Sequence, residues 1–320
     1  MFEIKKHTVP TPYLVGDIHY YSTEIDGDVI LFDTGPPTEF AIEALEKNVD
    51  LKRLKYVFFT HTHVDHFGLA YYLAEKTDAE ILISRRDALK LRRHHDRIFY
   101  MKRLLTGDAG FDDDFINELE TIFLKGRVFP DVPKRYSVVE ETDIAEKLGI
   151  YWLSCSGHSQ SDLVYIIGDN AITGDALLRN IFQVPLLDAD MESMYERFRN
   201  YDAYCDTLIK FKKIKGLKIL PAHNEYVDSL EETVIFYVTK IFERSRPLRE
   251  IPKELSVKEV VDILFGESNL DAFIKYLKAS EIVFFRDFLS QPEKLKSSLE
   301  QLGIFDKVKD EYYEVVNNRL

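Results

Sequence analysis

The sequence predicts an α/β protein in which two β-rich halves carry helices on their outer sides and a helical region follows. Over the first 225 of the 320 residues, short apolar runs typical of buried strands alternate with helical segments. This is the pattern of sheets covered by helices. After residue 225, segments with helix-capping residues at their ends replace the strand pattern. We therefore expect two domains, residues 1–225 and 226–320.

The first β-rich half is predicted from residues 13–84. Residues 13–33 predict two strands joined by a turn at Asp26-Gly27. A helix over residues 38–48, a buried strand over 55–60, a helix over about 67–76 and a strand over 80–84 are expected to follow. Together these elements predict a β-α-β-α-β unit.

A helical insertion is expected at about residues 85–130. Residues 85–103 hold eight basic and two acidic side chains and predict one long helix, and residues 112–124 predict another. If the first helix lies over a functional site, its cations would attract an anionic substrate; they are Arg85, Arg86, Lys90, Arg92, Arg93, Arg97, Lys102 and Arg103. Alternatively, they form a solvated face that pairs with the acidic run FDDDF at 111–115, with His94 and His95 at the surface.

The second β-rich half and the C-terminal region follow the insertion. Strands are expected over residues 136–139, 150–154, 162–167 and 171–173, then a long amphipathic helix over 190–214 and a strand over 217–220. The C-terminal region predicts helices over 229–245, 256–266, 271–289 and 292–303, then two strand-like pieces over 304–310 and 311–316. Helices followed by a small hairpin predict a winged-helix-like module.

Composition and charge argue against several classes of protein. The net charge of −13 disfavours holding nucleic acid by general electrostatics. Residues 228–320, with 14 basic and 18 acidic side chains, lack the footprint of a DNA-binding module. No apolar run approaches the ~18–20 residues that span a bilayer. Two cysteines cannot form a disulfide framework, so a cytoplasmic protein is expected; the oligomeric state does not follow from these features.

The segment THTHVDHFG at residues 60–68 carries the clearest chemical signal. His61, His63, Asp65 and His66 are four potential metal ligands within six residues, between a buried strand and a helix. Imidazole and carboxylate groups suit zinc, iron or manganese. Alternate residues of the loop point one way and the last two turn into the helix, which favours two adjacent metals over one.

Three further ligand-type residues each follow a predicted strand. His158 follows IYWLS, Asp175 follows NAIT and His223 follows LKIL. A single histidine after a strand is more often an ordinary loop residue than a ligand. As an ordered set behind HTHVDH, the three residues predict one composite metal site.

With these motifs, the sequence over about residues 10–225 resembles the metallo-β-lactamase-fold superfamily, whose pattern is HxHxDH, then His, Asp and His at strand ends. The resemblance implies a four-layer αβ/βα sandwich with the metals at the sheet edges. It implies one ion held by His61, His63 and His158, a second held by Asp65, His66 and His223, and Asp175 bridging both. The winged-helix-like tail resembles one branch of this superfamily.

The resemblance also implies supporting residues and a mechanism. Asp33-Thr34-Gly35 resembles an early DTG motif that packs beside the metal loop, and Asp33 and Thr60 are candidates for orienting ligands. Two divalent ions would bridge a water, lower its pKa from 15.7 to roughly 7 and direct the resulting hydroxide at the substrate. Asp65 would accept a hydrogen bond from that hydroxide and later carry a proton.

Departures from other branches narrow the expected activity. The flavodiiron oxidoreductases have a Glu where this chain has His63, and true zinc β-lactamases have a Cys where it has Asp175. We expect a binuclear metal-dependent hydrolase, with zinc favoured over iron or manganese, that acts on a small-molecule ester, thioester or lactone. The alternatives are a phosphodiesterase or ribonuclease, an iron-dependent oxidoreductase, and a metal-bearing interaction protein without turnover.

Overall fold

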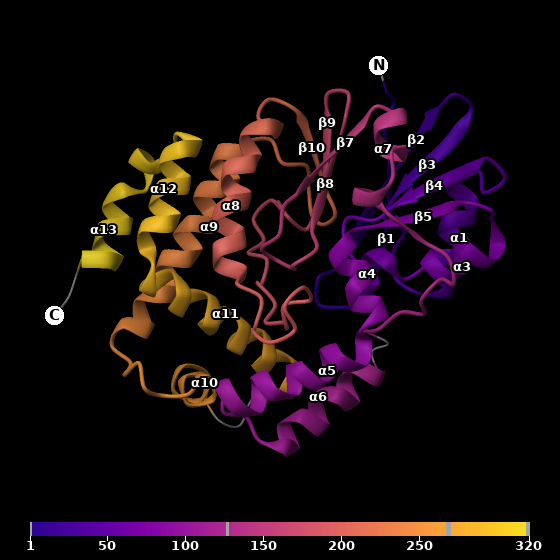
Figure 1. Ribbon diagram of the computed structural model, residues 1–320. Helices are drawn as coiled ribbons and strands as arrows, with labels where there is room; N and C mark the ends of the chain where they lie inside the picture. The colour runs from indigo at the N-terminus through magenta and orange to yellow at the C-terminus, as the bar shows by residue number, and fades with distance from the viewer. Residues whose placement is uncertain (1, 126–127, 267–269, 318–320) are drawn as a thin grey trace.

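The computed structural model describes residues 2–125, 128–266 and 270–317, and within them two sheets form the centre of the fold (Figure 1). The first sheet has six strands in sequence order: β1 (Lys5–Val9), β2 (Ile18–Ile25), β3 (Asp28–Phe32), β4 (Leu54–Phe58), β5 (Glu80–Ile83) and β6 (Ser137–Val138). The second sheet has the order β10-β9-β8-β7, with β7 (Ile150–Ser154), β8 (Leu163–Ile167), β9 (Asn170–Gly174) and β10 (Lys218–Pro221).

Each sheet contains both antiparallel and parallel strand pairs. Strands β1, β2 and β3 pair antiparallel, and β3, β4, β5 and β6 pair parallel. In the second sheet β7, β8 and β9 are antiparallel, and β10 runs parallel to β9. The Asp26-Gly27 turn joins β2 to β3 with positive φ at both residues, 53° and 87°, as expected of a tight hairpin.

Alternating side chains fill three apolar layers. Along β3, Ile30 and Phe32 face the core between the two sheets, whereas Leu31 joins the core on the outer side of the first sheet. The rings of Phe32, Phe58 and Tyr165 meet between the sheets with centroids 5.4–5.6 Å apart. Helices cover both outer faces, which confirms the predicted αβ/βα sandwich.

The helices of the first sheet and of the insertion follow one another along the chain. Helix α1 (Glu39–Asn48) begins where the Thr38 side chain accepts a hydrogen bond from the Ala41 N–H. The other elements are α2 (Val64–Phe67), α3 (Ala70–Lys76), α4 (Arg85–Arg92), α5 (His94–Arg103), the π-helical turn η1 (Leu104–Asp108), α6 (Asp113–Lys125), the 3₁₀ turn η2 (Val139–Glu141) and α7 (Ile144–Lys147).

Helices also cover the second sheet, and most belong to the C-terminal region. They are α8 (Asn200–Lys210), η3 (Phe211–Ile214), α9 (Leu230–Ser245), η4 (Arg246–Arg249), α10 (Val257–Phe265), α11 (Ala272–Ser290), α12 (Pro292–Leu302), η5 (Phe305–Lys307) and α13 (Lys309–Asn317). One apolar cluster combines side chains of α6, α8, α9 and α11. The C-terminal helices therefore pack directly on the outer side of the second sheet and on the insertion. No helix in the described ranges is long and apolar enough to cross a membrane.

Three sequence-based predictions were wrong. The single helix expected over 85–103 is two helices, because the backbone leaves the helical conformation at Arg93 (φ −110°, ψ 31°). The helix expected over 190–214 begins only at Asn200, because the Asp190 carboxylate accepts hydrogen bonds from the backbone of Glu192 and Ser193 and holds a turn there.

The third error concerns the predicted hairpin of the winged-helix-like module. Residues 305–307 and 309–317 are helical, so in the described residues the two strand-like pieces are absent. Phe305, Val308, Tyr312 and Val315 are all buried, and their spacing of three or four residues matches one face of a helix. The sequence also carried no signal for β1, a largely exposed strand of polar composition.

Candidate metal centre

The seven residues predicted to bind metal meet where the strands of both sheets end. Three of them lie on short α2 or at its start: His63 is the residue before the helix, and Asp65 and His66 lie within it. His158 follows β7, Asp175 follows β9 and His223 follows β10. Parallel strands deliver such residues to one edge of a sheet, and packing of the two sheets brings the two edges together.

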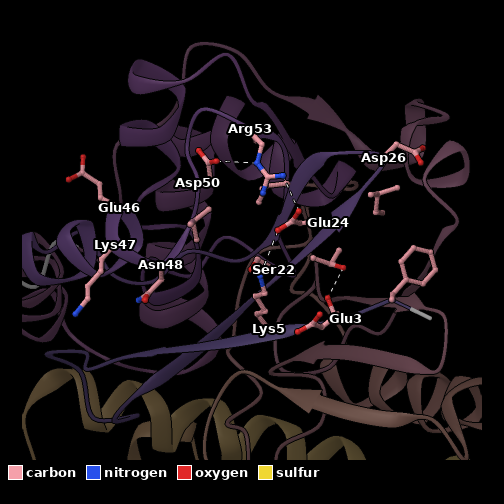
Figure 2. Close-up of a pocket in the computed structure, with 15 residues that line it drawn as sticks. Glu3, Lys5, Ser22, Glu24, Asp26, Glu46, Lys47, Asn48, Asp50 and Arg53 are labelled. Carbon is pink, nitrogen blue, oxygen red and sulfur yellow. Dashed lines mark hydrogen bonds and ion pairs between the residues drawn. The ribbon is translucent and has the colours of Figure 1, made fainter.

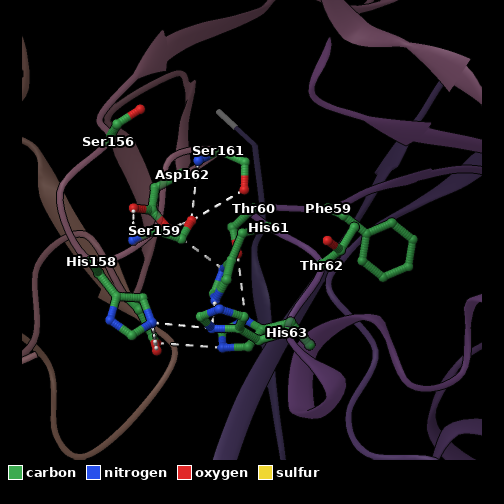
Figure 3. Close-up of polar contacts among 12 residues, drawn as sticks. Phe59, Thr60, His61, Thr62, His63, Ser156, His158, Ser159, Ser161 and Asp162 are labelled. Carbon is green, nitrogen blue, oxygen red and sulfur yellow. Dashed lines mark hydrogen bonds and ion pairs between the residues drawn. The ribbon is translucent and has the colours of Figure 1, made fainter. Parts of the chain in front are cut away.

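In the described residues, three overlapping sets of donors lie close enough together to share an ion: His61, His63 and His158; Asp65, His66 and His223; and His61, His66 and Asp175. The first two sets have no residue in common and are described as two groups. In the three-histidine group (His61, His63 and His158), Nδ1 of His63 lies 2.8 Å from Nε2 of His61 and 3.1 Å from Nε2 of His158. Figure 3 shows His63 and His158 facing one another across the gap between the two loops.

In the carboxylate group (Asp65, His66 and His223), Oδ2 of Asp65 lies 3.3 Å from Nε2 of His223 and 3.8 Å from Nε2 of His66.

Asp175 lies between the two groups. Its Oδ1 is 3.4 Å from Nε2 of His66 and 3.5 Å from Nε2 of His223, whereas its Oδ2 is 3.6 Å from Nε2 of His158. Each carboxylate oxygen therefore faces a different group, which is the placement that a bridging ligand needs.

The spacings around Asp65 and Asp175, and the lack of other partners there, fit a bound metal ion. Donors bound at 2.0–2.1 Å to one tetrahedral ion lie about 3.3 Å apart, close to the distances around Asp65 and Asp175. Nε2 of His66, Nε2 of His223 and Oδ1 of Asp175 are buried without a hydrogen-bond partner. Buried polar atoms are rarely left without a partner, and a cation between these three atoms would supply one.

Burial and charge set the protonation of these side chains. Burial lowers the pKa of His61 and of His63 well below the usual value, helped by the neighbouring histidines. Both rings are therefore neutral near pH 7 and have a nitrogen lone pair for a metal. Burial also disfavours charge on His66, but Asp175 and other nearby carboxylates raise its pKa well above the usual value. Before metal arrives, a proton on His66 offsets the negative charge of the carboxylates.

Contacts behind the ligands turn their free nitrogens toward the centre. Oδ2 of Asp33 accepts from Nδ1 of His66 at 2.9 Å and from Oγ1 of Thr60 at 2.8 Å. Asp33 and Thr60 thus contact the site as the sequence predicted. Nδ1 of His158 donates to the carbonyl of Val184 at 2.9 Å, and Nδ1 of His223 donates to the carbonyl of Asp17 at 2.8 Å. Sequence reasoning missed these two contacts because any residue type can supply a backbone carbonyl.

The turn GHSQSD supports both the site and a neighbouring loop. Ser159 donates to Asp162 through its backbone N–H and its hydroxyl, both at 2.8 Å (Figure 3). Oδ1 of Asp162 lies 4.0 Å from Nδ1 of His61. The Gln160 amide donates to Asp188 at 3.0 Å and accepts from the backbone of Met191 at 3.0 Å, which ties the turn to residues 188–191.

The basic residues of 85–103 do not pair with the acidic run at 111–115. Arg97 pairs with Asp188 at 2.9 Å, and Arg86 pairs with Glu192 at 3.2 Å. The helix break at Arg93 separates α4 from α5, and both helices contact the loop after β9. These arginines hold the loop whose Val184 carbonyl orients His158. His94 packs against the ring of Phe129, with centroids 4.8 Å apart, outside the donor groups.

A separate open cavity of about 870 Å³ lies beside β2 and the end of α1 (Figure 2). Arg53 bridges Glu24 at 3.0 Å and Asp50 at 3.1 Å within it. Lys5 also pairs with Glu24, and none of the seven donors is among the residues that line the cavity. The cavity therefore contributes nothing to the metal centre.

Comparison with known proteins identifies the family. The family model of the metallo-beta-lactamase superfamily matches residues 14–223, and the chain belongs to this superfamily. A metallo-beta-lactamase family protein from Thermus thermophilus superposes with a TM-score of 0.68 at 18% identity, covering 90% of this chain and 94% of that chain. A beta-lactamase domain protein from Burkholderia ambifaria gives 0.72 at 20% identity, covering 90% and 87%.

These structural matches establish the fold alone, and no curated protein matched the chain. Superfamily membership and the donor groups together support a metal-dependent hydrolase.

Proposed function

We propose that the protein is a binuclear metal-dependent hydrolase that acts on a small ester, thioester or lactone. The observation that carries the proposal is the placement of Asp175, whose two carboxylate oxygens face two different groups of buried donors. The three-histidine group would hold one ion, the carboxylate group the second, and Asp175 both. When bound, two divalent ions would supply hydroxide near neutral pH and polarise the oxygen under attack.

Asp65 is assigned the proton-transfer role. Its side chain is 10% exposed, and its Oδ2 lies 3.3 Å from Nε2 of His223. The carboxylate is therefore beside the donor atoms and still partly accessible to a substrate. A carboxylate in this position accepts a proton from the attacking water and returns it to the leaving group. Asp33, Val184 and Asp17 hold the outer nitrogens of three histidines, so the proton on each ring stays away from the centre.

Acyl substrates are preferred over phosphodiesters for an electrostatic reason. A phosphodiester carries a negative charge, so basic side chains that are free to contact it favour its binding. Arg86 and Arg97 are already paired with Glu192 and Asp188, and the chain carries a net charge of −13. Zinc is the proposed metal because imidazole and carboxylate donors suit it. Both cysteines are unpaired and buried, which agrees with the cytoplasmic location proposed from the sequence.

The test joins a metal analysis to a substrate panel. We expect two zinc ions per chain by mass spectrometry and hydrolysis of a thioester or lactone, with little cleavage of a phosphodiester. His61→Ala and Asp175→Ala should lose metal and activity, whereas His95→Ala, which removes an exposed histidine outside the donor groups, should keep both. Full activity in a metal-free His61→Ala protein would refute the mechanism. Bound iron together with oxygen uptake would indicate an oxidoreductase instead of a hydrolase.

A further inference from the structure

A buried ion pair lies directly behind the three-histidine group. Lys90 on α4 is only 5% exposed, and Asp87, one turn earlier, is fully buried. Nζ of Lys90 lies 3.2 Å from Oδ1 of Asp87. Lysine is among the residues least often fully buried, and it needs a partner when it is. None of the predicted roles of the basic segment accounts for a cation in this position.

Each member of the pair reaches a different loop of the metal centre. Oδ1 of Asp87 accepts from the hydroxyl of Thr62 at 2.7 Å. Thr62 lies between His61 and His63 in the sequence, so the aspartate holds the loop after β4.

Lys90 holds the other loop. Its Nζ donates to the hydroxyl of Ser161 at 2.7 Å, three residues after His158. Ser161 in turn lies 3.1 Å from the hydroxyl of Ser159, which donates to Asp162. Figure 3 shows Ser159, Ser161 and Asp162 on the same side of His61 as His158, and Thr62 on the other side of His61. The Lys90–Asp87 pair therefore connects two loops that belong to different sheets.

Stability alone does not account for such a pair. Removing two charges from water costs several kcal/mol per ion, and apolar residues of the same volume often stabilise a core equally well. A charged pair does, however, impose directions and distances on its partners that apolar side chains cannot. The outer contacts of the carboxylate group come instead from Asp33 and from the Asp17 carbonyl.

We propose that Lys90 and Asp87 are positioning residues that set the spacing of the three-histidine group by tying the loop after β4 to the turn after β7. Loss of the tie lets His158 move relative to His61 and His63, while the carboxylate group keeps its own supports. The pair thus governs the affinity of one metal site and not of the other. This inference rests on the proposed binuclear centre.

The test measures binding of Zn²⁺ and Co²⁺ to metal-free full-length protein by competition with a chelator and by the visible spectrum of the cobalt form. Thr62→Val and Ser161→Ala each remove one hydroxyl and leave the ion pair intact, and Lys90→Met removes the cation. Each variant should weaken one of the two binding steps by about 10–100-fold, the usual effect of losing a contact behind a ligand. The visible absorption bands that weaken in the cobalt form of these variants should be the bands that are missing from the cobalt form of His158→Ala.

Arg92→Met is the matched control, because Arg92 is an exposed cation on the same helix, stacked on Tyr136; it should bind both ions as the wild type does. Lys90→Met leaves Asp87 buried without its cation, so thermal unfolding is recorded in parallel. If that variant does not fold, the two hydroxyl variants decide the outcome. Unchanged affinities in them, or equal weakening of both steps, would overturn the positioning role. A wild type that binds fewer than two ions would instead overturn the proposed function.

Discussion

Replacing Asp33 by asparagine tests how the ligands are oriented without changing the size of the side chain. Asp33 is 2% exposed, and its backbone φ of 59° is one that asparagine tolerates. Its Oδ1 accepts from the Thr60 N–H at 2.8 Å, while its Oδ2 accepts from Nδ1 of His66. An asparagine amide can present only one oxygen. If its NH₂ faces His66, that ring must accept at Nδ1 and carry its proton on Nε2, the atom that faces Asp175.

The expected magnitude follows from this change of tautomer. In the first orientation of the amide, Nε2 of His66 must lose its proton before it can bind metal. In the opposite orientation, the amide oxygen faces His66 and the NH₂ group lies against the Thr60 N–H, where two donors meet. Either arrangement costs a charge-assisted hydrogen bond, about 1.5–3 kcal/mol. We expect metal affinity at the carboxylate group to fall by about 10–100-fold, which corresponds to about 1.4–2.8 kcal/mol.

Two measurements check this prediction. Chelator competition gives the affinity for each zinc ion, and nitrogen NMR of the labelled imidazoles reports which nitrogens of His66 carry a proton in the metal-free protein. In the metal-free wild type His66 carries a proton on both nitrogens, because, against the effect of burial, nearby carboxylates that include Asp33 raise its pKa. Asp33→Asn should lower that pKa, leave the neutral ring with its proton on Nε2, and weaken one binding step. Two zinc ions bound as tightly as in the wild type would show that Asp33 does not orient His66.

Two other predictions concern the backbone and the thiols. A Cβ at Gly174 (φ 52°) would lie 2.6 Å from Oγ1 of Thr60, whereas a Cβ at Gly216 (φ 86°) meets nothing within 4 Å. Gly174→Ala should therefore lower both the metal content and the melting temperature. Gly216→Ala, the control, should lower only the melting temperature, because it introduces backbone strain alone. Burial raises the pKa of Cys155 and of Cys205 to about 12, so at pH 8 a thiol reagent should find two reactive groups per chain only after unfolding. Because unfolded thiols ionise near pH 8.5, both cysteines favour the unfolded state as pH rises above that value, and a native protein whose thiols react rapidly would contradict their burial.

Local sequence was sufficient for the central strands of both sheets and for the candidate donor residues. From Val57 onward KYVFFT is buried in the sandwich, and its continuous apolar run already indicated a central strand. Ser256 and Gly266 marked the ends of α10 because capping chemistry acts within one helical turn. HTHVDH predicted a metal site because the ligands are neighbours in the sequence, and the structure brings all seven predicted donors together.

Local sequence was not sufficient where distant contacts compete with periodicity. The run 85–103 has the composition of one helix, but Arg93 leaves the helix and its side chain reaches the Met191 carbonyl at 3.4 Å. The pieces at 304–316 contain strand-forming residues, yet they form two helical segments whose buried rings of Phe305 and Tyr312 pack against each other with centroids 5.4 Å apart. Propensity is a small energy per residue, so tertiary burial overrides it.

The sequence by itself determined the fold family, which residues are candidate donors and the candidate support from Asp33, because each depends on residue types at fixed spacing. Only the tertiary structure decided which oxygen of Asp175 faces which group, which acidic residues neutralise the arginines, and that Lys90 lies buried behind the histidines. Those features depend on distances between segments up to about a hundred residues apart, such as Arg97 and Asp188. Such distances are set by packing of the two sheets and leave no periodic trace in the chain.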